Sequence, residues 1–261
     1  MASRLITGLT RERERSLQQR LFARVANATE PQIRKSISRA MREMGRHWDD
    51  TGRRSEAVQA HREEIEQILD RSWRRMFDAA GTRILEALQK SGRRMERKNE
   101  DEFARRMRDW MRTNGARKVT QIAGTTEDQA TSIINDAVAR ASDEGLGQDG
   151  IGKLVESAIR DEGGVISRHR ARVIARTETH TASQAANNEA AAATGLQLRK
   201  EWLAAGGGDT RDDHSDADGQ TVAMNDPFDV GGERLMYPGD PSGSAENVIN
   251  CRCAVGFVPV E

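Results

Sequence analysis

The chain has 261 residues and no net charge, with 31% charged, 36% hydrophobic and 4% aromatic residues. This composition argues against a thick core along the whole length and favours long helices with narrow apolar stripes. The sequence contains no run of about eighteen apolar residues, so we expect no membrane-spanning helix and no membrane partner.

The charges are distributed unevenly along the chain. Residues 1–120 contain 29 Lys and Arg against 18 Asp and Glu, a net charge of +11, and the remaining residues therefore carry −11. Arginine suits phosphate and carboxylate partners, and a split of this kind suggests two regions with different roles. The alternative is that arginine and glutamate simply alternate on solvated helix faces.

The first half of the chain is predicted to be helical. Leu17, Leu21 and Val25 mark one segment, and a second opens at Pro31, which a first helical turn tolerates. From about residue 55 to 113 the apolar residues recur at three- and four-residue steps. So long and narrow a stripe needs partner helices, either from the same chain or from another copy.

Stop and start signals predict several shorter helices in the middle of the chain. Asn114-Gly115 predicts a stop, and Thr126 with Gln129 predicts a capping box for the next helix. A short helix is expected to end at Gly163-Gly164, and a further one to run from Ser167 to Gly195.

After Gly195 the apolar period changes from that of helices to that of strands. Leu198 and Trp202 predict a strand, the segment 234–237 after two glycines predicts a hairpin arm, and 251–258 a closing strand. The predicted fold is a mainly α N-terminal region with long helices, followed by a small α+β domain with a short antiparallel sheet. We divide it into an elongated Arg-rich stem (1–120), a short helical connector (121–165) and the α+β domain (166–261).

The ordered motifs of residues 150–258 resemble those of the Mu F-like minor head proteins of tailed bacteriophages, the phage head morphogenesis family. The residues that carry the resemblance are Arg176, Thr177, Glu178, Trp202, Arg211, His214, Gly219, Phe228, the Pro238–Asp240 turn, Asn250, Cys251, Arg252 and Cys253. We expect most of them to be structural, with Arg176, Thr177 and Glu178 holding their helix against the small sheet.

The resemblance implies a non-enzymatic protein of the virion, made in the host bacterial cytoplasm and placed inside the head near the portal vertex. Its implied partners are the portal protein, major capsid or scaffold proteins and packaged double-stranded DNA, and its N-terminal helices are candidates for self-association. Arg168, Arg170 and Arg172 form a basic patch that suits phosphate or an acidic portal surface, although a solvated helix start explains it equally well.

The two cysteines of the chain, Cys251 and Cys253, lie two residues apart, which disfavours a disulfide between them. Many Mu F-like relatives carry Cys-x-x-Cys and His-Pro-x-Cys-Arg-Cys, a set that resembles a zinc cluster. This chain has Arg211 and Val248 at two of those positions, so His214, Cys251 and Cys253 remain as candidate ligands.

A fourth zinc ligand is needed for a tetrahedral site, and Asp216, a neighbouring aspartate or a water molecule is a candidate. In the alternative interpretation His214 hydrogen-bonds the turn, and both cysteines pack as small apolar groups. Two rival functions follow from the same residues. One is a metal-dependent nuclease centred on His214, and the other is a non-specific DNA-binding protein acting through the Arg-rich half.

Overall fold

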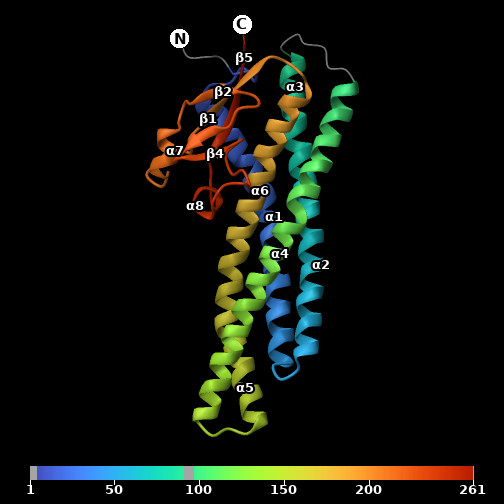
Figure 1. The fold of residues 1–261 in the computed structure, drawn as a ribbon, viewed down its shortest axis with the longest axis vertical. Coiled ribbons are helices and arrows are strands. Elements are labelled where there is room, and N and C mark those ends of the chain that lie inside the picture. The colour runs from blue at the N-terminus through green and yellow to red at the C-terminus, as the bar shows by residue number, and fades with distance from the viewer. Residues whose placement is uncertain (1–4, 91–96, 261) are drawn as a thin grey trace. The chain divides into compact units, whose positions relative to one another are not determined.

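The computed structural model describes residues 5–90 and 97–260 of the chain. These residues form long helices followed by small antiparallel sheets, so the predicted fold class is confirmed (Figure 1). The chain divides into two compact units. Unit 1 consists of residues 1–27, 72–112 and 176–261, as far as these are described, and unit 2 consists of residues 28–71 and 113–175.

The helices and strands follow one another in this order. The α-helices are α1 (Arg11–Arg46), α2 (Thr51–Met76), α3 (Thr82–Lys90), α4 (Arg97–Asp143), α5 (Gln148–Ala158), α6 (Gly164–Ala193), α7 (Asp212–Asp216) and α8 (Ala245–Val248). The π-helical segments η1 (Phe77–Gly81) and η2 (Ile159–Gly163) connect α2 to α3 and α5 to α6. The strands are β1 (Leu198–Leu203), β2 (Thr221–Ala223), β3 (Phe228–Val230), β4 (Glu233–Leu235) and β5 (Ala254–Pro259).

Several helix boundaries predicted from local signals are wrong. Pro31 lies inside α1, Asn114-Gly115 lies inside α4, and the chain stays helical through Gly163-Gly164. Thr126 is no cap: it lies buried within α4, and its hydroxyl donates to the Ile122 carbonyl at 2.9 Å. A glycine inside a helix costs about 1 kcal/mol and a proline about 3 kcal/mol, and burial of a long apolar face offsets such costs.

The division predicted from the sequence also differs from the two compact units. The boundary expected at residue 120 falls inside α4, and that at 165 falls near the start of α6. In addition, residues 1–27 belong to the same unit as the C-terminal sheets. Residues 176–261 of the predicted α+β domain are therefore only part of unit 1, and residues 166–175 belong to unit 2.

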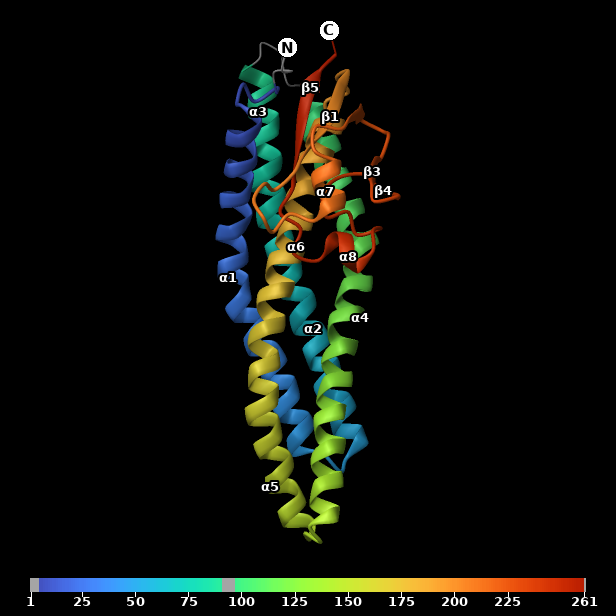
Figure 2. The same ribbon diagram turned by 90° about the vertical axis from the view of Figure 1, so that its left-hand side faces the viewer.

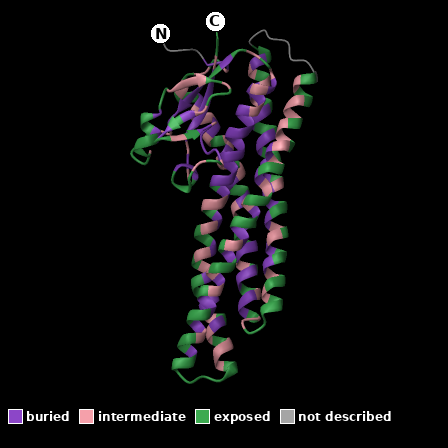
Figure 3. Cartoon of the chain, in the orientation of Figure 1, coloured by how far each residue is buried: buried purple, intermediate pink, exposed green. Residues whose placement is uncertain are grey.

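Unit 2 is a bundle of helical segments from α1, α2, α4 and α6, together with α5 and η2. Figures 1 and 2 show these segments running side by side, and Figure 3 shows that the long helices carry both buried and exposed residues along their length. Its fully buried side chains include Ile33, Ile37, Met41, Met44, Ile65 and Leu69. None of the described helices in either unit has the length and apolar character that a membrane crossing requires.

A buried polar network centred on His61 lies inside unit 2. Ser36 Oγ is 2.8 Å from His61 Nδ1, and Thr126 Oγ1 is 3.2 Å from His61 Nε2. Because the Thr126 hydroxyl donates to Ile122 and accepts a 2.7 Å bond from Arg170, it is an acceptor for the His61 Nε2–H. Burial, aided by the Arg170 charge and opposed by that of Glu64, lowers the pKa of His61 to about 4.

Unit 1 contains both antiparallel sheets. The first has the strand order β2-β1-β5, and the second is the hairpin of β3 and β4, with the turn at Gly231-Gly232 that the sequence predicts. In the first sheet Trp202 lies opposite Val255, and both are fully buried. Trp202, Phe228 and Phe257 lie in one apolar cluster, to which α3 and α6 also contribute.

The outer edge of β5 is covered by residues of other segments. The Val255 N–H donates to the Gln184 side chain at 3.0 Å, and the Val255 carbonyl accepts from Gln18 at 2.9 Å. The Ile6 N–H donates to the Phe257 carbonyl at 2.8 Å. An unpaired strand edge is a template for aggregation, and these bonds remove it.

Gln18 uses all of its hydrogen-bonding capacity inside unit 1. Its amide nitrogen donates to the Val255 carbonyl and, at 2.6 Å, to Glu14. Its oxygen accepts from Gln184 at 3.1 Å and from Asn187 at 3.0 Å. A glutamine amide has two donors and two acceptor sites, so Gln18 is saturated by α1, α6 and β5.

We predict that Gln18→Leu lowers the free energy of unfolding of the protein by about 3 kcal/mol, because several buried polar groups lose a partner. Urea denaturation followed by circular dichroism measures this loss. Gln32→Leu is the matched control, because Gln32 is exposed on the same helix and bonds the backbone one turn earlier. A change below about 0.5 kcal/mol is expected there, and an equally small change in Gln18→Leu would contradict the role of Gln18.

We also predict that His61 makes the stability of the protein depend on pH between about 6.5 and 4. The pKa of His61 in the folded protein lies below the ordinary histidine value of 6.5, so the unfolded chain binds the proton first as the pH falls and stability is lost across this range. His61→Gln should reduce the slope of unfolding free energy against pH by up to about 1.4 kcal/mol per pH unit. His169→Gln, at an exposed position of α6, is the control; an unchanged slope in His61→Gln would contradict the prediction.

Candidate metal centre

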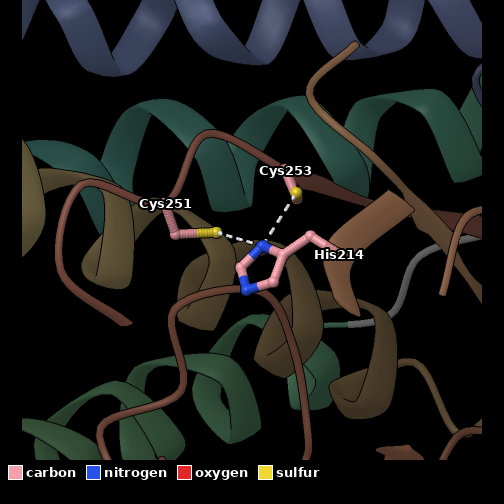
Figure 4. Close-up of side chains that lie close together, drawn as sticks. All are labelled: His214, Cys251 and Cys253. Atoms are coloured by element: carbon pink, nitrogen blue, oxygen red, sulfur yellow. Dashed lines mark hydrogen bonds between the residues drawn. The ribbon is translucent and has the colours of Figure 1, made fainter. Parts of the chain in front are cut away.

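Three predicted ligands come together in unit 1. His214 lies on α7, and Cys251 and Cys253 lie in the segment between α8 and β5 (Figure 4). His214 Nδ1 is 3.4 Å from Cys253 Sγ and 3.7 Å from Cys251 Sγ. Their ligand atoms all lie within 4.8 Å of one another, and each of the three residues is at most 2% exposed.

The turn before Cys251 has a local cause in the sequence. Asn250 has a φ of +59°, a left-handed conformation that asparagine tolerates better than most residues. Its backbone N–H donates to Thr177 Oγ1 on α6 at 3.1 Å. Arg211, which precedes α7, donates to the Ile249 carbonyl at 2.6 Å. These two bonds tie the Cys251 segment to α6 and to the segment that carries His214.

The His214 ring is held on the side away from the sulfurs. Its Nε2 lies 3.2 Å from Asn247 Oδ1, which comes from α8. The Trp202 ring packs edge to face against it, with ring centroids 5.6 Å apart. Both contacts are buried, so the Nδ1 atom is left facing the two cysteines.

The two thiols differ in acidity. A hydrogen bond from Cys251 is the main cause that lowers the pKa of Cys253 to about 5, while burial opposes it and the Ala205 N–H assists. The pKa of Cys251 is raised well above its ordinary value, because its thiol donates that bond and is buried. Cys253 is therefore the more acidic of the two thiols, and both cysteines are free of any disulfide.

The donor set fits a zinc ion. Zinc–sulfur bonds of about 2.3 Å and zinc–nitrogen bonds of about 2.0 Å, at tetrahedral angles, place nitrogen and sulfur about 3.6 Å apart. The two observed separations, 3.4 and 3.7 Å, bracket this value. Thiolate and imidazole are also the ligand types that zinc prefers.

Asp216 is one of the candidates for a fourth ligand, and it does not join the group of three among the described residues. It lies at the end of α7 and is exposed. His180, which the sequence places on the neighbouring helix, contacts the backbone of the site instead: its Nε2 lies 2.8 Å from the Cys253 carbonyl. The described chain therefore offers three close ligands.

The predicted structural residues lie around the site in different ways. Thr177 and Glu178 are buried, whereas Arg176 is exposed. Gly219, with a φ of +78°, donates from its N–H to the Trp202 carbonyl at 2.9 Å. Arg252 lies 3.4 Å from the Asp209 carboxylate.

The predicted basic patch lies on the part of α6 that belongs to unit 2, and its three arginines do not act alike. Arg168 and Arg172 are exposed, and Arg172 lies 3.8 Å from the Glu30 carboxylate. Arg170 is half-buried, donates to Thr126 and to the Ile122 carbonyl, and has its pKa lowered to about 10 by burial. Only Arg168 and Arg172 are thus placed to meet an external phosphate or carboxylate.

Sequence reasoning missed Asn247 and the Ala205 N–H as partners of the site. Ser244 caps α8 by accepting from the Asn247 N–H, so a start signal for that helix is present in the sequence. Nothing in that signal shows that the Asn247 side chain meets a histidine 33 positions earlier in the chain. The Ala205 N–H cannot be found from the sequence, because almost every residue type has a backbone N–H.

Comparison with known proteins identifies the region that contains the site. Residues 132–256 match the family described as Phage Mu protein F like protein, which confirms the predicted resemblance for that region. The chain is 36% identical over 95 residues to the uncharacterized protein YqbB of Bacillus subtilis (strain 168). This match covers 35% of the chain and only 31% of the length of that relative. No solved structure matches the chain.

Proposed function

We propose that this protein is a minor head protein of a tailed bacteriophage that assists head assembly at the portal vertex. The family match over residues 132–256 is the observation that carries the proposal, because this family is one of phage head morphogenesis. The portal protein, major capsid or scaffold proteins and packaged DNA are the proposed neighbours inside the virion. The helices of residues 1–120 are proposed to supply contacts with these partners or with further copies of the chain.

The buried state of the candidate centre supports a structural role over a nuclease. His214, Cys251 and Cys253 are at most 2% exposed, so a phosphodiester has no access to them in this conformation. A hydrolytic metal site keeps an open position for water and substrate. The exposed aspartates near α7 do not share the site with these three residues.

Phage particles separated into heads and tails test the proposed function. We expect mass spectrometry to find the chain in heads, and a strain with a stop codon early in its gene to yield fewer complete heads. Portal complexes released from disrupted heads should retain the chain. Its absence from heads, together with normal head assembly in the stop-codon strain, would contradict the proposal; steeply salt-dependent DNA binding alone would favour the DNA-binding alternative.

We further propose that His214, Cys251 and Cys253 bind one zinc ion that stabilises unit 1. The near-tetrahedral spacing of the three donors, the burial of the site and the bond from His214 to Asn247 support this. Zinc would replace the thiol protons and connect α7 to the segment before β5. Metal binding to such a site contributes directly to the free energy of folding.

Purified protein is expected to contain one zinc per chain by elemental analysis. The double variant Cys251→Ser and Cys253→Ser should lose it and melt at least about 5 °C lower. Asp216→Asn is the control and should keep its zinc, because Asp216 lies outside the group of three. Metal-free protein whose melting temperature does not respond to zinc would contradict the proposal and leave the cysteines as packing residues.

A further inference from the structure

We propose that Asn247 is the positioning residue of the candidate metal centre. Its side chain sets the tautomer of His214, with the proton on Nε2 and the lone pair of Nδ1 directed at the two sulfurs. The effect of Asn247 on metal affinity rests on the zinc binding proposed above. Its effect on the tautomer concerns the protein with or without metal.

The orientation of the Asn247 amide follows from its surroundings. The amide nitrogen lies 3.5 Å from the Val230 carbonyl at the end of β3, and a carbonyl can only accept. With its nitrogen directed at the β3–β4 hairpin, Asn247 must present its oxygen to His214.

The orientation of the amide determines which His214 nitrogen carries the proton. A carbonyl oxygen 3.2 Å from Nε2 can accept a hydrogen bond but cannot donate one, so Nε2 is the protonated nitrogen of the neutral ring. The opposite tautomer would set two acceptors against each other in a buried place. It would also put the proton on Nδ1, between the ring and the sulfurs.

Two further contacts keep this arrangement in place. Ser244 Oγ accepts from the Asn247 backbone N–H at 3.3 Å, which fixes α8 at its start. The Ser244 N–H in turn donates to the Glu233 carboxylate at 2.8 Å. The Asn247 side chain, 6% exposed, is thus held by the hairpin and by its own helix cap, and water has little room to replace it. Partners of this kind change metal affinity by 10–100-fold in known sites.

Nitrogen-15 NMR of the His214 ring in metal-free protein tests the tautomer directly, with the signals assigned by their loss in His214→Gln. We expect the Nε2–H form in the wild type. Asn247→Leu should lose this preference and bind zinc about 10–100-fold more weakly in a chelator competition. Glu246→Leu, at an exposed position of the same helix, should behave as the wild type.

Two results would overturn the proposal: an Nδ1–H tautomer in the wild type, or an unchanged tautomer in a folded Asn247→Leu variant. The wild-type spectrum decides the first point even where Asn247→Leu does not fold. If the wild-type protein holds the Nε2–H tautomer but binds no zinc, the zinc proposal fails. The proposal that Asn247 sets the tautomer is then still supported. The two proposals therefore fail separately.

Discussion

The structure of unit 1 depends on the hydrogen bonds that helix side chains make to the outer edge of β5 and the residues before it. The carbonyls of Cys253 and Val255 accept from His180 and Gln18, and the Val255 N–H donates to Gln184. His180 and Gln184 lie four residues apart on α6, so they share one face of that helix. A strand edge buried without such partners would cost about 1–3 kcal/mol for each unpaired group.

The same interaction brings the N-terminal segment and the candidate metal centre into one compact unit. Gln18 belongs to α1, and Cys253 comes two residues before Val255. Small residues on α6 allow its neighbours to approach closely: Ala182, Ala185, Ala186, Ala190 and Ala191 are all buried. A chain with few aromatic residues thereby builds a dense interior from alanines and from paired polar side chains, rather than from a thick apolar core.

The sequence predicts β1, the β3–β4 hairpin and β5 because their signals are local, whereas β2 is not predicted. Leu198 and Trp202 mark β1, although Lys200 interrupts their alternation, and paired glycines mark the β3–β4 turn. Helix ends were predicted poorly in the first two thirds of the chain, since Pro31 and Asn114-Gly115 sit in helices whose packing outweighs the local preference. The sequence does not predict that Gln18 and His61 each bond several buried groups, because their hydrogen-bond partners lie far away along the chain.

The same distinction applies to the candidate centre. His214, Cys251 and Cys253 were found from residue types, whereas Asn247 was not, because an asparagine near a helix start suggests capping first. Asp216 was proposed for its carboxylate, yet it ends α7 exposed to solvent. A ligand type in the sequence gives the chemistry that is available, and only the fold determines which side chains meet.

Arg211 is one of the positions where this chain differs from the cysteine pattern that the resemblance implies. The resemblance implies a cysteine at this position, and here a guanidinium donates to the Ile249 carbonyl at 2.6 Å. That bond ties the start of α7 to the segment before Cys251, which is the connection an additional metal ligand would otherwise make. Val248, where the resemblance implies a histidine, is 3% exposed. One hydrogen bond and one buried side chain thus occupy these two positions, and the ligand atoms of His214, Cys251 and Cys253 lie within 4.8 Å of one another.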